Sequence, residues 1–297
     1  MTTCVPALRI IAAALAASVV LTACSTADNT PAPAAGDPDP GTGHLHGLGV
    51  DPADGSLYAA GHLGVFRLTG TPAVRIADRY QDTMGFTITG PRTFLASGHP
   101  SPTDPAATSP HLGLIRSADA GVTWTALSAG GEADFHSLQQ AGATLYGYDS
   151  RTFQVWASTD GGRTWDRRAK LPADDLAAHA DAPDDLWAAG PQGLMHSTDG
   201  GRIFQPVTGA PRLAAVERPE SGRLIALDAD GTLLTSGDGS TWIEQGQLPN
   251  AAKPSVLTAA SPTHLLAADT SDTVYESTDG GRSWTVVHRP AYEVAGH

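Results

Sequence analysis

An eight-residue stretch that recurs along the chain decides the fold. Residues 158–165 read S-T-D-G-G-R-T-W, and close copies are S-A-D-A-G-V-T-W at 117–124, S-T-D-G-G-R-I-F at 197–204 and S-T-D-G-G-R-S-W at 277–284. A shorter copy, S-G-D-G-S-T-W, occupies 236–242. The aromatic residues that close the copies stand at 124, 165, 204, 242 and 284, so their spacings are 41, 39, 38 and 42 residues. Such a period is typical of a four-stranded propeller blade.

The residue types of the repeat suit a tight hairpin turn. An aspartate can accept hydrogen bonds from nearby backbone N–H groups, and glycine adopts the positive φ that such turns need. The closing aromatic side chain then packs into the blade. We therefore assign structural roles, rather than catalytic or calcium-binding ones, to the repeated residues. They are Asp119, Gly121 and Trp124; Asp160, Gly162 and Trp165; Asp199, Gly201 and Phe204; Asp238 and Trp242; and Asp279, Gly281 and Trp284.

These copies resemble the Asp-box, or BNR, repeat of sialidases, sortilin-type receptors and related propellers, which implies an all-β fold. Six pairs of short apolar segments precede the repeats, and the first pair is followed by residues 69–72 (T-G-T-P) instead of a copy. Residues 44–290 divided by six give about 41 residues per unit, as blades of this kind need. We predict a six-bladed β-propeller over residues 44–297 with Asp-box turns, and seven blades as the lesser alternative.

The N-terminus predicts export. Residues 1–23 combine Arg9 with an apolar run over 10–21 that is too short for a transmembrane helix. The following L-T-A-C resembles the bacterial lipoprotein signal, which implies that Cys24 is lipidated; an ordinary cleavage site with a chance cysteine is the alternative. Residues 24–43 are rich in Pro, Ala, Asp and Gly and predict a flexible tether. We expect a lipid-anchored protein of the cell envelope, on the outer side of the cytoplasmic membrane.

Composition excludes some partners. The formal net charge is -13, and the only two lysines are Lys170 and Lys253. Nucleic-acid binding needs clustered basic residues, so we exclude it. After removal of residues 1–23 a single cysteine remains, and no internal disulfide can form. We expect a monomer.

Histidines and acids are predicted to gather at one mouth of the ring. Six of the eleven histidines fall at strand ends or turns of the first three blades, and His111 ends the proline-rich loop that starts at His99. Histidine with carboxylate suits zinc, and histidine with a nearby thioether suits copper. The alternative for these histidines is that they pair with backbone groups at strand ends. The loop over residues 99–111 is either a lid over the mouth or a plain surface loop. The candidate metal ligands are His44, His46, His62, His99, His136, Asp82, Met84 and Asp134. We interpret His179, His196, His264 and His288 as ordinary histidines.

The resemblance to sialidases also raises the question of hydrolysis. The resemblance implies that such an enzyme needs three arginines, a Tyr–Glu nucleophile and an acid, for which the candidates are Glu132, Asp82, Tyr148 and Arg79. The Arg-Ile-Pro signature of that family is absent, and we predict that Glu132 and Asp82 do not flank an arginine cluster. We lean against catalysis, because a fold does not imply an activity.

The whole chain also resembles small envelope lipoproteins of high-GC bacteria known as BNR-repeat glycosyl hydrolases. The residues that carry this likeness are H-L-H-G-L-G at 44–49 and D-T-M-G-F at 82–86. It is similar as well to photosystem assembly propellers, which bind protein partners. Three hypotheses therefore stand: a propeller that binds a metal or small envelope ligand, a protein-interaction scaffold, and a sialidase-like glycoside hydrolase acting on carbohydrate.

Overall fold

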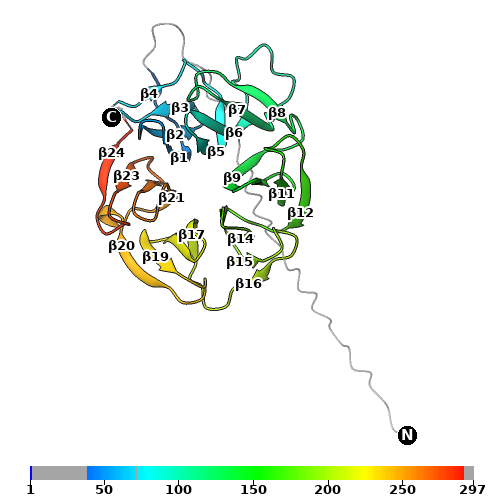
Figure 1. The fold of residues 1–297 in the computed structure, drawn as a ribbon, viewed down its shortest axis with the longest axis vertical. Helices are drawn as coiled ribbons and strands as arrows, with labels where there is room; N and C mark the ends of the chain where they lie inside the picture. Colours follow the sequence, from blue (N-terminus) through cyan, green and yellow to red (C-terminus); the bar gives the residue numbers. More distant parts are fainter. Residues whose placement is uncertain (2–38, 71, 291–297) are drawn as a thin grey trace.

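The computed structural model describes residues 1, 39–70 and 72–290. Residues 45–288 form a ring of six four-stranded antiparallel sheets (Figure 1). The predicted signal segment, Cys24 and most of the predicted tether lie outside the described residues, as does the tail 291–297. Among the described residues, no helix has the length and apolar character needed to cross a membrane.

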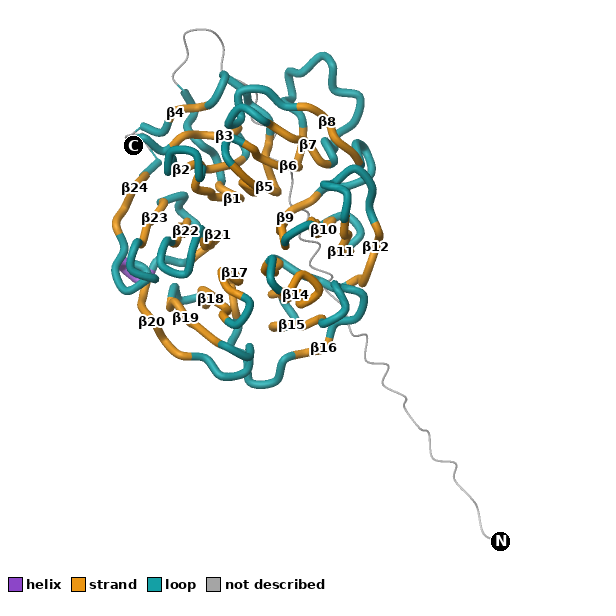
Figure 2. The backbone as a smooth tube through the Cα atoms, viewed as in Figure 1, coloured by secondary structure: helices purple, strands orange, loops and turns teal. Residues whose placement is uncertain are grey.

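The first three blades follow one another in chain order around the ring. The first strand of each sheet lies nearest the axis and the fourth lies outermost (Figures 1 and 2). Their strands are β1 (Leu45–Val50), β2 (Leu57–Gly61), β3 (Gly64–Arg67) and β4 (Val74–Arg75); β5 (Asp82–Gly90), β6 (Thr93–His99), β7 (Leu114–Ser117) and β8 (Thr125–Ser128); and β9 (Phe135–Ala141), β10 (Thr144–Asp149), β11 (Gln154–Ser158) and β12 (Asp166–Lys170).

The last three blades complete the circle in the same order. A single 3₁₀ turn, η1 (Pro249–Ala251), links the fifth blade to the sixth. Their strands are β13 (Asp175–His179), β14 (Ala182–Gly190), β15 (Gly193–Ser197) and β16 (Gln205–Pro206); β17 (Leu213–Glu220), β18 (Arg223–Asp228), β19 (Thr232–Ser236) and β20 (Ile243–Gln247); and β21 (Pro254–Ala259), β22 (Leu265–Asp269), β23 (Val274–Ser277) and β24 (Thr285–His288). The six-bladed prediction is confirmed.

The core lies between blades rather than inside one of them. Six apolar clusters are present in the described residues, and each draws its side chains from two neighbouring blades. The second strand of a blade is therefore covered on both faces, as in β22, where all five residues are buried. The outermost strands face water, as β12 does, and carry exposed polar residues such as Asp166 and Arg167. Burial of apolar area between blades is the main stabilising term of such a ring.

The repeated turns are held by a common set of hydrogen bonds. In the copy at 158–165, the Ser158 hydroxyl donates to Asp160 (2.7 Å) and accepts from the Gly162 N–H (2.8 Å). The Asp160 carboxylate also accepts from the N–H and hydroxyl of Thr164 (2.9 and 2.7 Å). These bonds lower the pKa of Asp160 well below its ordinary value. Both oxygens of this aspartate thus accept hydrogen bonds within the turn.

The ring closes without sharing a strand between its two ends. All four strands of the sixth blade come from the C-terminal part of the described chain, and the seam with the first blade is an apolar cluster that includes Leu45, Leu48 and Leu266. Asp272 adds the polar link, because one of its oxygens accepts the buried N–H of Leu45 (2.9 Å). The Thr258 hydroxyl donates to the Leu48 carbonyl oxygen (3.1 Å). The sixth and first blades are therefore joined by side-chain contacts rather than by a shared sheet.

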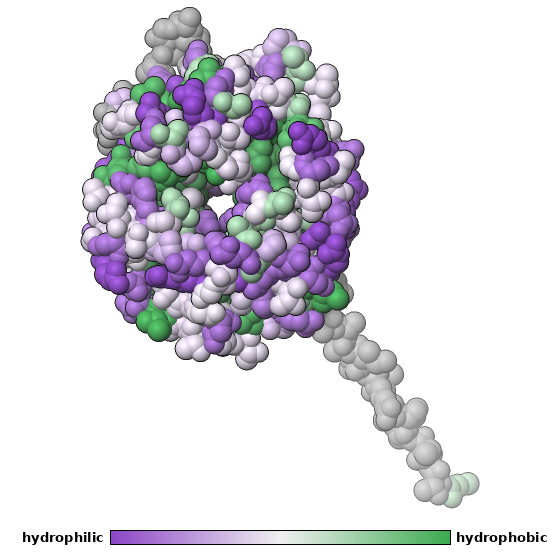
Figure 3. Space-filling model, in the orientation of Figure 1, coloured by the Kyte–Doolittle hydropathy of each residue, from purple (hydrophilic) through white to green (hydrophobic). Residues whose placement is uncertain are grey.

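Two acids face the central channel, which is open along the axis of the ring (Figure 3). Burial and the neighbouring carboxylate of Asp175 raise the pKa of Glu217 to about 8, and Gln139 donates to its Oε2 (3.2 Å). Burial also raises the pKa of Asp175, although the hydrogen bonds that it accepts from the N–H groups of Leu176 and Val216 oppose that rise. The fold thus favours a proton on Glu217 near neutral pH.

We expect Glu217→Gln to flatten the dependence of stability on pH. The ordinary pKa of this group is 4.5, so folding takes up a proton between pH 4.5 and about 8. The stability that the protonated Glu217 contributes is complete below pH 4.5 and is lost as the pH rises through about 8. Glu217 should account for roughly 1–2 kcal/mol of the fall in the unfolding free energy of the wild type over this window, allowing for solvent in the channel. Asp175, whose pKa is also raised, adds to the fall in the same direction.

Urea denaturation between pH 5 and 8, in the presence of a chelator, measures this dependence. The exposed Glu220→Gln provides the matched control and should keep the wild-type profile. An unchanged decline in Glu217→Gln would show that this carboxylate is ionised in the folded protein.

Candidate functional site

All eight predicted metal ligands line one cavity of about 1160 Å³ at the mouth of the ring. His44 and His46 come from the start of β1, His62 from the turn between β2 and β3, and Asp82 and Met84 from the start of β5. These strand ends meet because consecutive blades present the same loops on the same face. The remaining lining residues that carry ring nitrogens, carboxylates or a guanidinium are His99, Asp104, His111, Asp134, His136 and Arg151.

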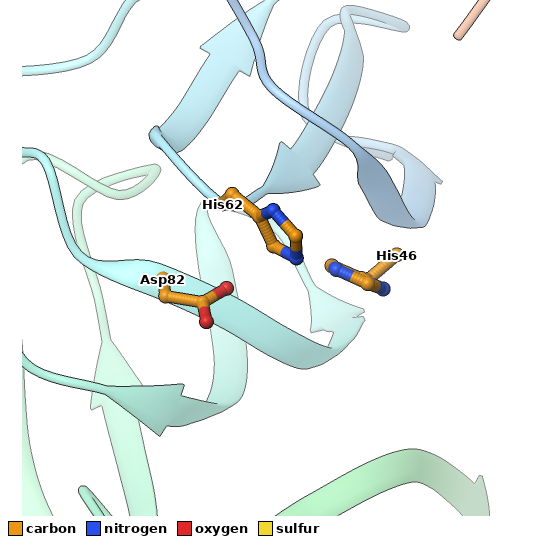
Figure 4. A group of neighbouring side chains, drawn as sticks. All are labelled: His46, His62 and Asp82. Carbon is orange, nitrogen blue, oxygen red and sulfur yellow. The ribbon is translucent and has the colours of Figure 1, made fainter. Parts of the chain in front are cut away.

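One group of potential ligands lies across the first and second blades. A ring nitrogen of His46, one of His62 and a carboxylate oxygen of Asp82 lie within 4.8 Å of one another. The rings of His46 and His62 lie side by side, tilted by 40° with centroids 4.7 Å apart, and Asp82 approaches from the neighbouring strand (Figure 4). His44 stands beside them, and its Nδ1 lies 3.0 Å from an oxygen of Asp272 in the sixth blade.

A second group lies across the second and third blades. A ring nitrogen of His99, one of His111 and a carboxylate oxygen of Asp134 also lie within 4.8 Å of one another. The Oδ2 atom of Asp134 lies 3.1 Å from Nε2 of His136 and accepts the hydroxyl of Ser150 (3.2 Å). These contacts fix the orientation of the carboxylate.

His99 connects the two groups. Its Nδ1 lies 2.9 Å from Oδ2 of Asp82, and its Nε2 lies 3.5 Å from Oδ2 of Asp134. These two carboxylates raise the pKa of His99 to about 10, while the histidines around Asp134 help to hold the pKa of that acid far below its ordinary range. Without a bound cation, His99 is therefore an imidazolium between two carboxylates.

The pKa of His46 is shifted in the opposite direction. Burial, together with the nearby His62 and His44, lowers the pKa of His46 to about 3. Burial also lowers the pKa of His111. Both rings are therefore neutral at physiological pH, and neutral imidazole is the form that binds metals.

Several buried polar atoms of this cavity have no hydrogen-bond partner. Among the described residues, the buried side-chain atoms without a partner include Nε2 of His46, Oδ1 of Asp82, Nδ1 of His111 and Oδ1 of Asp134. Asp82 and Asp134 are only 8% and 5% exposed, and no other carboxylate oxygen of the described chain is left in this state. A buried polar atom without a hydrogen bond is costly, so such atoms call for a cation or a water.

The loop that joins His99 to His111 forms one wall of the cavity. Its residues Pro100, Ser101, Pro102 and Asp104 line the space, as does the stretch from Ala107 to Pro110. His111 was not among the predicted ligands, although its place at the end of this loop marked it as a neighbour. Asp272 was also missed, because the sequence does not show which side chain of the sixth blade contacts the start of the first.

The candidate catalytic residues do not gather in the cavity. Glu132 points into solvent and pairs with Arg167 (2.9 Å), and Arg79 binds Gln81 (3.3 and 3.4 Å). Tyr148 is 2% exposed, and its hydroxyl donates to the Leu171 carbonyl oxygen (3.1 Å). Of the four, only Asp82 lines the cavity.

The histidines interpreted as ordinary lie outside this cavity. His179 has Asp181 within 3.7 Å, and His264 pairs with Glu276 (2.7 Å). His196 pairs with Asp185 and stacks on Trp187 with ring centroids 3.8 Å apart. His288 is 4% exposed, and neither of its ring nitrogens has a partner in the described residues.

Comparisons with known proteins identify the fold. No protein-family model and no curated protein matches the chain. The structure titled "YCF48 bound to D1 peptide" has a TM-score of 0.52 at 14% identity, covering 84% of this chain and 82% of that one. A GH74 enzyme from Niastella koreensis has a TM-score of 0.52 at 20% identity. A GH74 xyloglucanase from Xanthomonas campestris has a TM-score of 0.51, also at 20% identity, and each match covers 82% of this chain.

The chain spans little more than a third of the length of the two GH74 enzymes, 37% and 38%. At these identities the likeness shows a β-propeller fold, which hosts many unrelated functions.

Proposed function

We propose that this protein is a lipid-anchored propeller of the cell envelope that binds a divalent transition metal in the histidine-rich cavity. The observation that carries the proposal is the convergence of buried, unpartnered ligand atoms, above all Nε2 of His46 and Oδ1 of Asp82. Burying a carboxylate oxygen and an imidazole nitrogen without a hydrogen bond is unfavourable, and coordination of a cation satisfies both atoms at once.

The donor set favours zinc or copper over calcium or magnesium. Imidazole nitrogens suit zinc and copper, whereas calcium and magnesium prefer sites made of oxygen atoms. Copper binds a given set of nitrogen and oxygen ligands more tightly than zinc, and Met84 in the same cavity offers a thioether to copper. Both ions are therefore used as probes.

Metal binding is expected to stabilise the fold and to depend on His46 and Asp82. The full chain, purified in detergent with a tag that contains no histidine, is stripped with a chelator and titrated with Zn²⁺, Cu²⁺ or Mg²⁺. At free zinc a hundredfold above Kd, one bound ion stabilises a protein by about 2.7 kcal/mol, so the Tm should rise by several degrees. Magnesium should leave the Tm unchanged.

Calorimetry on three variants locates the binding. Asp82→Asn and His46→Gln should lose zinc binding at this position, whereas His264→Gln, whose partner is Glu276, should bind as the wild type does. Wild-type zinc affinity in both cavity variants would falsify the proposal. The intact mass of the same sample also reports on the anchor: we expect a chain that begins at a diacylated or triacylated Cys24, and an unmodified cysteine would contradict the anchor.

A further inference from the structure

The metal-binding cavity contains two sets of ligands rather than one. The first set is His46, His62 and Asp82, from the first blade and the start of the second. The second set is made of His99, His111 and Asp134, from the end of β6, the cavity loop and the residue before β9. No residue belongs to both sets.

Each set contributes its own unpartnered atoms. One imidazole nitrogen and one carboxylate oxygen are buried without a hydrogen bond in the first set, on His46 and Asp82. The same pair of atom types is left in the second set, on His111 and Asp134. One ion in the first set would leave the second pair unsatisfied, and the reverse also holds. We propose, on the basis of the metal-binding function above, that the cavity holds two transition-metal ions, one in each set.

The contact between the sets allows both to be filled. Asp82 uses Oδ2 to pair with Nδ1 of His99, which leaves its Oδ1 for the first ion. With Nδ1 held in this way, His99 presents Nε2 toward Asp134 and the second ion. A histidine that gives one ring nitrogen to a carboxylate and the other to a metal is a common arrangement at metal sites, because the carboxylate fixes the ring. The two ions therefore do not compete for an atom.

Asp134 is also held by contacts to one of its two carboxylate oxygens. Its Oδ2 is held by His136 and by the Ser150 hydroxyl, and this oxygen lies 3.5 Å from Nε2 of His99 and 4.0 Å from Nδ1 of His111. Its Oδ1 is buried without a hydrogen bond, so this carboxylate still has an oxygen to offer to an ion. Three protein ligands in each set leave a coordination position open for water, as in zinc sites that accept exogenous ligands. The cavity of about 1160 Å³ has room for such ligands.

A metal-free alternative uses His99 alone. As an imidazolium, His99 neutralises part of the charge of Asp82 and Asp134. Their Oδ2 atoms, which face its ring, then need no second ion. That arrangement nevertheless leaves Nδ1 of His111 and Oδ1 of Asp134 buried without partners. Counting the bound ions separates these two arrangements.

Native mass spectrometry of the metal-stripped full chain, titrated with Zn²⁺ near pH 7, provides that count. The wild type is expected to bind two ions. His62→Gln, which alters only the first set, and His111→Gln, which alters only the second, should each retain one ion, and the double variant should retain none. His264→Gln should retain two. His62 and His111 lie on the cavity wall in a turn and a loop, so polar substitutions there are compatible with folding.

The outcomes separate this inference from the proposed function. A wild type that binds a single ion, lost from either single variant, would show one shared site and overturn the two-ion inference while metal binding stands. A wild type that binds no ion would remove both proposals. Titration of the wild type with Co²⁺, followed by visible absorption, gives the count again without any variant: saturation at two equivalents supports two sites, and saturation at one contradicts them.

Discussion

Replacing Gly281 by alanine is expected to lower the free energy of unfolding by about 3 kcal/mol. Gly281 has a φ of +85°, a conformation that alanine adopts only at a cost. A Cβ atom at this position would also overlap with Cδ2 of Leu233, a fully buried side chain of the neighbouring fifth blade. The turn therefore serves a second purpose, since it packs one blade against the next.

Gly222→Ala is the matched control for this change. Gly222 lies in a turn of the fifth blade, has no positive φ and has open space where a Cβ would stand. Its substitution should change stability by less than about 0.5 kcal/mol. Urea denaturation of both variants measures the difference, and equal stabilities would show that the repeated glycine is not needed for packing between blades.

Asp272→Ala is expected to weaken the closure of the ring and to cost about 2 kcal/mol. The substitution removes the acceptor of the Leu45 N–H, a buried donor at the seam between the sixth and first blades. It also removes the partner of Nδ1 of His44. Because the seam has no shared strand, the loss should appear as faster amide exchange in β1 and β22 before the other strands.

Asp272→Asn separates the hydrogen bond from the charge. Asparagine keeps an acceptor oxygen and tolerates the positive φ of 60° at this position, so most of the stability should return. The measurements are made with a chelator present, so that any metal in the cavity does not mask the effect. Uniform amide exchange across all six blades in Asp272→Ala would contradict a local role at the seam.

The prediction of the site from the sequence rested on position within the repeat. Once the blades were aligned, His46, His62 and Asp82 fell on one face of adjacent blades, and the structure brings them within 4.8 Å. The same alignment placed Tyr148 among the catalytic candidates, but it does not show which way a strand residue points. The Tyr148 side chain packs inward, and its hydroxyl bonds Leu171.

The sequence by itself determined the number of blades, the residues of the turns and the face on which histidines collect. It could do so because each of these features is local and is repeated at a fixed period. Only the tertiary structure decided which atoms remain without partners, how His99 connects the two sets of ligands and how Asp272 closes the ring. Those features depend on contacts between residues far apart in the chain, such as Leu45 and Asp272, and on burial that raises the pKa of Glu217. No local pattern encodes them, because they arise only when six blades are packed around one axis.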